Sequence, residues 1–164
     1  MTVDSIEKLL LEELKDLHSA ETQITKTLPK LIKAASSQDL KKAFEKHLKE
    51  TEGQIERLDQ IFEILGKKST NKTCAGMKGI LTEGSEMLQE TETGEVRDAA
   101  LISAAQRVEH YEISAYGTVR AYAEQMDQSE VANLLQETLD EEKATDEKLT
   151  EISKKINSAA KRAA

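Results

Sequence analysis

The sequence is poor in residues that interrupt or cross-link a chain. It has one proline, seven glycines and one cysteine among 164 residues, and it has no tryptophan. A single cysteine excludes an internal disulfide and a cysteine-based zinc or iron–sulfur site, which is typical of a protein from a reducing cytoplasm. Because little in the chain breaks a helix, we expect long helices and almost no strand.

Long apolar runs and a basic surface are also missing. No stretch is apolar enough to cross a bilayer, and the first residues lack the features of a signal peptide. Acidic residues outnumber basic ones by 31 to 23, which gives a formal net charge of −8. This excess argues against a surface that coats nucleic acid. We therefore predict a cytoplasmic protein with no membrane or nucleic-acid partner.

Apolar residues recur every three or four positions over four long stretches, which is the pattern of amphipathic helices. The first stretch ends near residue 35 and contains Pro29, which we expect to kink the helix without ending it. The second begins at Ser36 and Asp39, which have the spacing of a capping box, and it closes at Gly66.

A polar segment, 67–73, follows the second stretch and leads into a shorter amphipathic pattern from Met77 to Leu88. A connection of this length lets the long helices before and after it run parallel. We expect the third long helix from Thr93 to Gln125, and the fourth to start at a capping box of Asp127 and Glu130.

These patterns predict an all-α protein, a four-helix bundle with a long helix-containing crossover between its second and third helices. A chain of 164 residues can bury a core as a single domain. We assign 1–164 to that domain, with 1–157 in the bundle and 158–164 as a flexible basic tail.

Acidic residues interrupt the apolar side of the long helices. Glu112 falls on the face marked by Leu101, Val108 and Val119, and Glu109 precedes it by one turn. Desolvating carboxylates without partners costs several kcal/mol each, so such a group needs cations, protons or a metal. The acids on the four helices are Glu21, Glu50, Glu109 with Glu112, and Glu142 with Asp146.

Carboxylates that converge from four helices are typical of a site for two divalent metal ions, as in ferritin-like bundles. We expect iron, with manganese or zinc as alternatives. Such bundles usually carry histidine three residues after an acid on their second and fourth helices. Here Gly53 follows Glu50 and Thr145 follows Glu142 at that spacing, so coordination is expected to be less complete.

Two substitute ligands stand one turn from Glu50. They are Gln54 and His47, although a surface histidine, or one that hydrogen-bonds a ligand, is the commoner role for His47. On the fourth helix, an internal repeat with an offset of 91 residues selects Glu141 as the ligand. The apolar face selects Glu142, which we prefer because facing inward is a physical requirement.

The alternative for each acid is a charge that faces solvent, since 33% of the residues are charged. That interpretation is favoured for one glutamate alone, but the coincidence on four helices favours a site. Tyr116 is interpreted as a packed core residue, with a hydrogen bond to a site carboxylate as the alternative. We interpret His18 and His110 as structural or solvent-facing, and Cys74 as a loop thiol.

Four segments, one from each long helix, are distinctive in combination: SAETQITKTLPKL (19–31), HLKETEGQIERL (47–58), EVRDAALISAAQRVEHYEI (95–113) and ETLDEEKATDEKL (137–149). Together they resemble the bacterial YciF-like family over nearly the whole chain. The resemblance implies a ferritin-like, rubrerythrin-related bundle, commonly a homodimer, in proteins linked to stress responses. It makes Glu21, Glu50, Glu109, Glu112 and Glu142 the candidate ligands, followed by Gln54 and Asp146.

Two functions remain open at this point. The first is a stress-associated metal-binding protein with a dinuclear iron or manganese site that, if it is an enzyme, acts on O2 or peroxide. The second is a non-catalytic structural or interaction protein in which the site is degenerate. An iron-storing or DNA-protecting cage is disfavoured by the acidic balance.

Overall fold

The regular elements of the protein are all helices. The computed structural model describes residues 2–69 and 72–162, and no strand occurs among them. The helices are α1 (Ile6–Ala34), α2 (Gln38–Ile64), α3 (Ala75–Glu90), α4 (Glu95–Gln125) and α5 (Ser129–Arg162). The predicted all-α class is confirmed.

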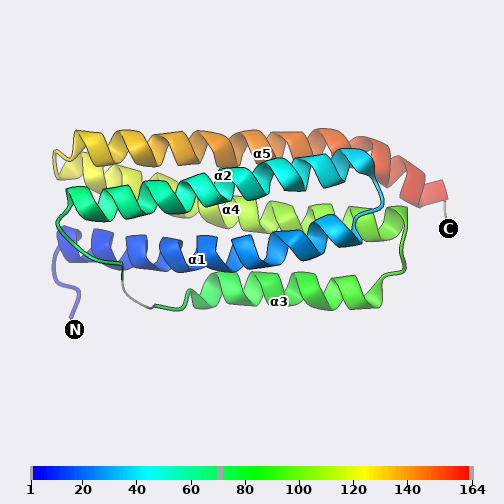
Figure 1. Ribbon diagram of the computed structural model, residues 1–164, viewed down its shortest axis with the longest axis horizontal. Coiled ribbons are helices and arrows are strands. Elements are labelled where there is room, and N and C mark those ends of the chain that lie inside the picture. The colour runs from blue at the N-terminus through cyan, green and yellow to red at the C-terminus, as the bar shows by residue number, and fades with distance from the viewer. Residues whose placement is uncertain (1, 70–71, 163–164) are drawn as a thin grey trace.

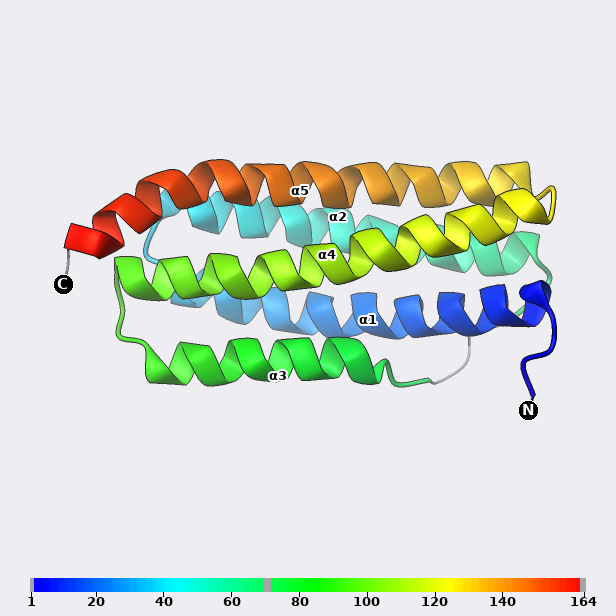
Figure 2. The same cartoon turned by 180° about the vertical axis from the view of Figure 1, so that it is seen from behind.

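Helices α1, α2, α4 and α5 form a four-helix bundle, and α3 packs outside it against α1 and α4 (Figures 1 and 2). The chain reverses between α1 and α2 and again between α4 and α5. Figure 1 shows that α3 carries the chain back along the bundle, so that α2 and α4 run in the same direction. The predicted crossover between the second and third bundle helices is confirmed.

The start of α2 differs from the prediction by one residue. Ser37, and not Ser36, caps the helix, because its Oγ accepts from the backbone N–H of Leu40 at 3.4 Å. The N–H groups of Ser36 and Ser37 instead donate to the two carboxylate oxygens of Asp98, each at 2.7 Å. Asp98 is 2% exposed and ties the α1–α2 loop to α4, so the predicted Ser36–Asp39 box is wrong.

The start of α5 also corrects the prediction. Asp127 has φ 55 and lies in the left-handed region that reverses the chain after α4, a conformation that Asp tolerates better than most residues. The backbone N–H of Ala132 bonds the carbonyl of Gln128 at 2.9 Å, so the first turn closes on Gln128. The proposed capping box of Asp127 and Glu130 is therefore wrong.

Two other expected helix features agree with the structure, and a third differs. Helix α1 continues through Pro29 to Ala34, and Gly66 follows α2 with φ +63, as a glycine beyond a helix end commonly does. Residues 158–162 of the predicted tail belong to α5, whereas 163 and 164 lie outside the described residues.

The core of the bundle has two apolar halves. One contains Leu10, Leu14 and Leu17 of α1, and the other contains Ile24 and Leu28 of the same helix. On α2, α4 and α5 the buried residues of the two halves are separated by about two to four turns. Most of the buried polar residues, with Asp98 and Thr138 as exceptions, lie between the two halves, near mid-height in the bundle.

Candidate metal centre

A layer of buried polar side chains separates the two apolar halves. Each of its main members is at most 3% exposed, and each bundle helix contributes at least one. It consists of four glutamates, one histidine and one glutamine: Glu21, Glu109, Glu112, Glu142, His47 and Gln54. We call this set the polar layer.

Four members of the polar layer meet closely. His47, Glu109, Glu112 and Glu142 each offer one ligand atom, and these atoms all lie within 4.8 Å of one another. The Nε2 atom of His47 lies 3.2 Å from Oε1 of Glu109. Carboxylate and imidazole donors at this spacing suit iron, manganese or zinc.

The surface position considered for His47 is wrong, since this side chain is 3% exposed. The inward face of α2 passes through His47, Thr51 and Gln54, whereas Leu48 and Ile55 are only half-buried. Apolar periodicity alone would place Leu48 and Ile55 on the inward face, because it treats polar residues as solvent-facing.

Glu21 of α1 lies beside this group and is held by Tyr116. The Tyr116 hydroxyl donates to Oε1 of Glu21, and both side chains are fully buried. Both interpretations of Tyr116 are thus correct, because it packs in the core and also bonds a carboxylate. Burial and the charge of Glu142 raise the pKa of Glu21 to about 8, against the lowering effect of the Tyr116 hydrogen bond.

The buried glutamates of the polar layer lie close enough to repel one another when they are charged. Burial, with the nearby Glu142 as the next cause, raises the pKa of Glu109 and of Glu112 well above the ordinary value. Burial lowers the pKa of His47. Desolvation therefore favours the neutral form of all these groups when no cation is present, and like charges add to that effect for the carboxylates.

Several buried atoms of the layer have no hydrogen-bond partner in the described residues. They include both carboxylate oxygens of Glu112, Oε2 of Glu21, Glu109 and Glu142, and both ring nitrogens of His47. A buried acceptor without a donor costs about 1–3 kcal/mol, and more when it is charged. A bound cation would satisfy these atoms, so the donor set fits a metal.

Glu50 and Glu141 have cationic partners outside the layer. Lys46 bonds one oxygen of Glu50, whose side chain is 20% exposed, while its other oxygen is buried without a partner. Arg57 binds Glu141 through two contacts, at 3.0 and 3.1 Å. Of the two neighbouring residues considered on α5, Glu142 lies in the interior and Glu141 at its edge.

Gln54 links these two glutamates. Its side-chain amide donates to Oε2 of Glu141 at 3.0 Å and also to Oε1 of Glu142. Such an amide fixes the orientation of Glu142 while leaving the second oxygen of that carboxylate free. Gln54 therefore lies next to the group of four as a positioning residue.

Asp146 stands apart from the group of four. Its carboxylate accepts from the Gln106 amide at 3.0 Å and lies 3.2 Å from Nε2 of His110, which is at the surface. The other surface histidine, His18, lies 3.1 Å from Asp59. Neither histidine faces the polar layer.

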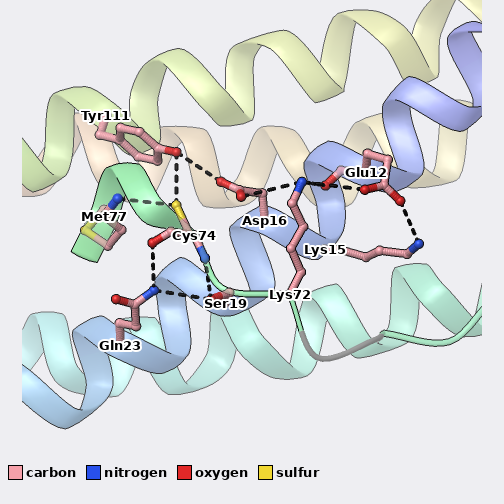
Figure 3. Close-up of polar contacts among 9 residues, drawn as sticks. All are labelled: Glu12, Lys15, Asp16, Ser19, Gln23, Lys72, Cys74, Met77 and Tyr111. Atoms are coloured by element: carbon pink, nitrogen blue, oxygen red, sulfur yellow. Dashed lines mark hydrogen bonds and ion pairs between the residues drawn. The ribbon is translucent and has the colours of Figure 1, made fainter. Parts of the chain in front are cut away.

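Cys74 lies in the loop before α3, as expected, but it is fully buried. Its buried Sγ caps α3 by accepting from the Met77 N–H at 3.3 Å, and it lies 3.1 Å from the Tyr111 hydroxyl (Figure 3). Tyr111 in turn donates to Asp16 at 3.0 Å. These contacts fasten the start of α3 to α1 and α4. Burial raises the pKa of the Cys74 thiol, so it is not an activated thiolate.

Lys46 and Arg57 were not predicted from the sequence. Lys46 stands four residues before Glu50, a spacing at which helical side chains meet. This ion pair could therefore have been predicted from the sequence. Arg57 bonds Glu141 across two helices, and no local spacing signals that contact.

Comparisons with known proteins cover almost the whole chain. A family model described as Domain of unknown function (DUF892) matches residues 5–162. Protein YciF of Escherichia coli (strain K12) is 49% identical over 164 residues, which are 99% of this chain and 98% of that protein. The crystal structure of the E. coli stress protein YciF matches with a TM-score of 0.92 and 48% identity, over 95% of this chain and 99% of that one.

Other solved structures agree with this arrangement. YcfI from Rhodopseudomonas palustris matches with a TM-score of 0.88 and 44% identity, over 90% of this chain and 94% of that one. A protein from Xanthomonas campestris pv. campestris, 19% identical over 97% of this chain and 98% of its own, shares the fold with a TM-score of 0.78. The matches confirm the predicted resemblance: the chain belongs to the DUF892 family, as a relative of the E. coli stress protein YciF.

Proposed function

We propose that this protein is a stress-associated, ferritin-like metal-binding protein. Its polar layer would hold a carboxylate-bridged pair of divalent ions, iron first and manganese or zinc otherwise. The carrying observation is the burial of Glu109, Glu112, Glu142 and His47 with ligand atoms within 4.8 Å of one another. Glu112 adds to it, because neither of its oxygens has a hydrogen-bond partner among the residues that the structure describes.

The position of each side chain indicates its role in binding the ions. Glu109 or Glu112 would bridge the ions, since both come from neighbouring turns of α4. Glu142 and His47 would bind from the opposite helices, and Glu21 would complete the set on the α1 side. When bound, iron or manganese would supply Lewis acidity and electrons for reaction with O2 or peroxide.

The residues around the site orient its carboxylates and exclude water from it. Tyr116 donates to Glu21 and Gln54 donates to Glu142, which orients both carboxylates. The apolar halves above and below exclude water, and low polarity strengthens the attraction between carboxylates and a cation.

Metal content per chain tests this function. We expect protein reloaded with iron(II) or manganese(II), and analysed by mass spectrometry, to hold close to two equivalents. Glu112→Gln should lose most of them, whereas Glu147→Gln, which changes an exposed glutamate on α5, should not. Unchanged stoichiometry in Glu112→Gln would sink the assignment.

A second candidate is a non-catalytic structural or interaction protein of the stress response. It is favoured by the partners that Glu50 and Glu141 already have, and by Gly53 and Thr145 at the usual histidine positions. Such a protein would show the same melting temperature with and without iron or manganese. A melting temperature that rises with metal concentration would exclude it.

For the assembly we propose a homodimer, as the family resemblance implies. The chain has a mass of 18.2 kDa, so sedimentation equilibrium separates a dimer from a monomer and from a cage of many subunits. A monomer at micromolar concentration would contradict the dimer.

A further inference from the structure

A groove lies on the surface between α2 and α5. It has a volume of about 550 Å³, and its lining includes Lys42, Lys46, Glu50, Ala144, Thr145 and Lys148. Figure 1 shows α2 and α5 side by side along their length. Glu50 lies one turn from His47, and Thr145 lies one turn from Glu142, so the groove reaches the level of the proposed centre.

The side chain of Thr145, on α5, is small at the point where the groove approaches the interior of the bundle. Thr145 lines the groove and is 8% exposed. Its short side chain therefore separates the solvent in the groove from the buried region around Glu142. A histidine at this position would extend a ring into the same space. On α2, a side chain at Gly53 would also meet open space, because a Cβ there has no neighbour within 4 Å.

Glu50 is shared between the groove and the interior. One oxygen bonds the Lys46 ammonium, whose side chain is 66% exposed, and the other oxygen is buried without a partner. The carboxylate therefore has one cation on one oxygen, while its second, buried oxygen has no partner among the described residues. The Lys46 ammonium thus binds Glu50 at the surface end of the site, where a metal ion would first meet a carboxylate.

We propose that metal ions reach the centre through this α2–α5 groove and that Glu50, held by Lys46, is its gate. Glu50 would release the Lys46 ammonium to hold an arriving divalent ion, and the buried carboxylates of the polar layer would then bind that ion. The proposal rests on the metal-binding function proposed above. The net charge of −8 draws cations to the protein, and the lysines along the groove set the barrier that an ion must pass.

Filling the groove tests the route. Zinc(II), which is redox-inert, would be mixed with metal-free protein in a stopped-flow instrument, with a chromophoric chelator reporting free zinc. Ala144 is exposed in the groove, so Ala144→Trp should slow loading several-fold and leave the final zinc content unchanged. Ser103→Trp places the same ring in the groove between α4 and α5 and should load at the wild-type rate.

Removing the lysine tests the gate. Lys46→Met should speed loading by up to about fivefold, the range of a single exposed ion pair. Lys42→Met removes the same charge from the same groove, and Lys42 has no ion-pair partner among residues 2–69 and 72–162. Its effect should be clearly smaller, and equal effects of the two variants would overturn the gating role of Lys46.

The final zinc content distinguishes the two proposals. If the wild-type protein binds zinc and Ala144→Trp loads just as fast, the route is wrong and the centre stands. If the wild-type protein holds neither zinc(II) nor iron(II) nor manganese(II) at saturation, the centre is wrong and the route falls with it. Circular dichroism of each variant confirms that a slow rate does not come from misfolding.

Discussion

Tyr116 donates its hydroxyl hydrogen to Glu21, which joins α4 to α1 inside the polar layer. Neither side chain is exposed to solvent, so this donor is the main compensation that Glu21 has for its burial. The carboxylate retains a second oxygen without a partner. The contact therefore stabilises the fold and keeps one carboxylate oriented toward the site.

We predict that Tyr116→Phe lowers the free energy of unfolding by about 1–3 kcal/mol, because a buried acceptor loses its donor. The loss should be larger at about pH 8.5 than at about pH 6, since the hydrogen bond favours the charged carboxylate and the pKa of Glu21 is about 8. Urea unfolding of the metal-free protein at both pH values measures this. Tyr122→Phe on the same helix is the control, and an equal loss at both pH values would contradict the argument.

The metal-free protein should become less stable as the pH rises from about 5 to about 8. The pKa values of Glu21, Glu109 and Glu112 are raised in the folded state, so in this range the folded chain binds more protons than the unfolded one. His47, whose pKa is lowered, acts in the opposite direction below about pH 6.5, but it is one group against three.

Thermal unfolding in the presence of a chelator checks this sign. We expect a melting temperature several degrees lower at about pH 8 than at about pH 5.5. Zinc(II) should reduce or reverse the difference, because its ligands must be deprotonated. A melting temperature that rises with pH in chelator would show that the layer does not carry these protons.

The fold was predictable because its determinants are local. Apolar spacing along α1 marks Leu10, Leu14 and Leu17, and all three are buried. The length of the segment before α4 was enough to predict the crossover. Helix starts were less predictable, because the cap of α2 depends on Asp98, which lies 61 and 62 residues from the amides it binds.

The site was only partly predictable because contacts between helices decide which acids meet. Glu112 and Glu142 follow from the apolar face of their own helices, and both are buried. Asp146 has the same apparent register, but contacts with Gln106 and His110 hold it at the edge of the bundle. No spacing within α5 distinguishes Asp146 from Glu142.

Glu112→Leu should stabilise the metal-free protein. Both oxygens of Glu112 are buried without partners among the described residues, and replacing such a carboxyl group by an apolar side chain of similar size removes its desolvation cost. We expect a gain of about 1–3 kcal/mol in urea unfolding at about pH 8, and complete loss of the stabilisation by zinc(II). Because Glu112→Gln keeps a polar group in the layer, it should gain less. A clear loss of stability in Glu112→Leu would mean that Glu112 supports the fold and not a metal.

Cys74 should matter as a helix cap and not as a reactive thiol. Its Sγ accepts from Met77 and lies beside Tyr111, so Cys74→Ala should cost about 1 kcal/mol, while Cys74→Ser keeps an acceptor and costs less. The loss in Cys74→Ala should appear first as faster amide hydrogen exchange in α3, since this contact fastens α3 to the bundle (Figure 3). Exchange in α5 is the internal control. If Cys74→Ser loosened α3 as much as Cys74→Ala, packing of the sulfur atom and not capping would explain why this position is buried.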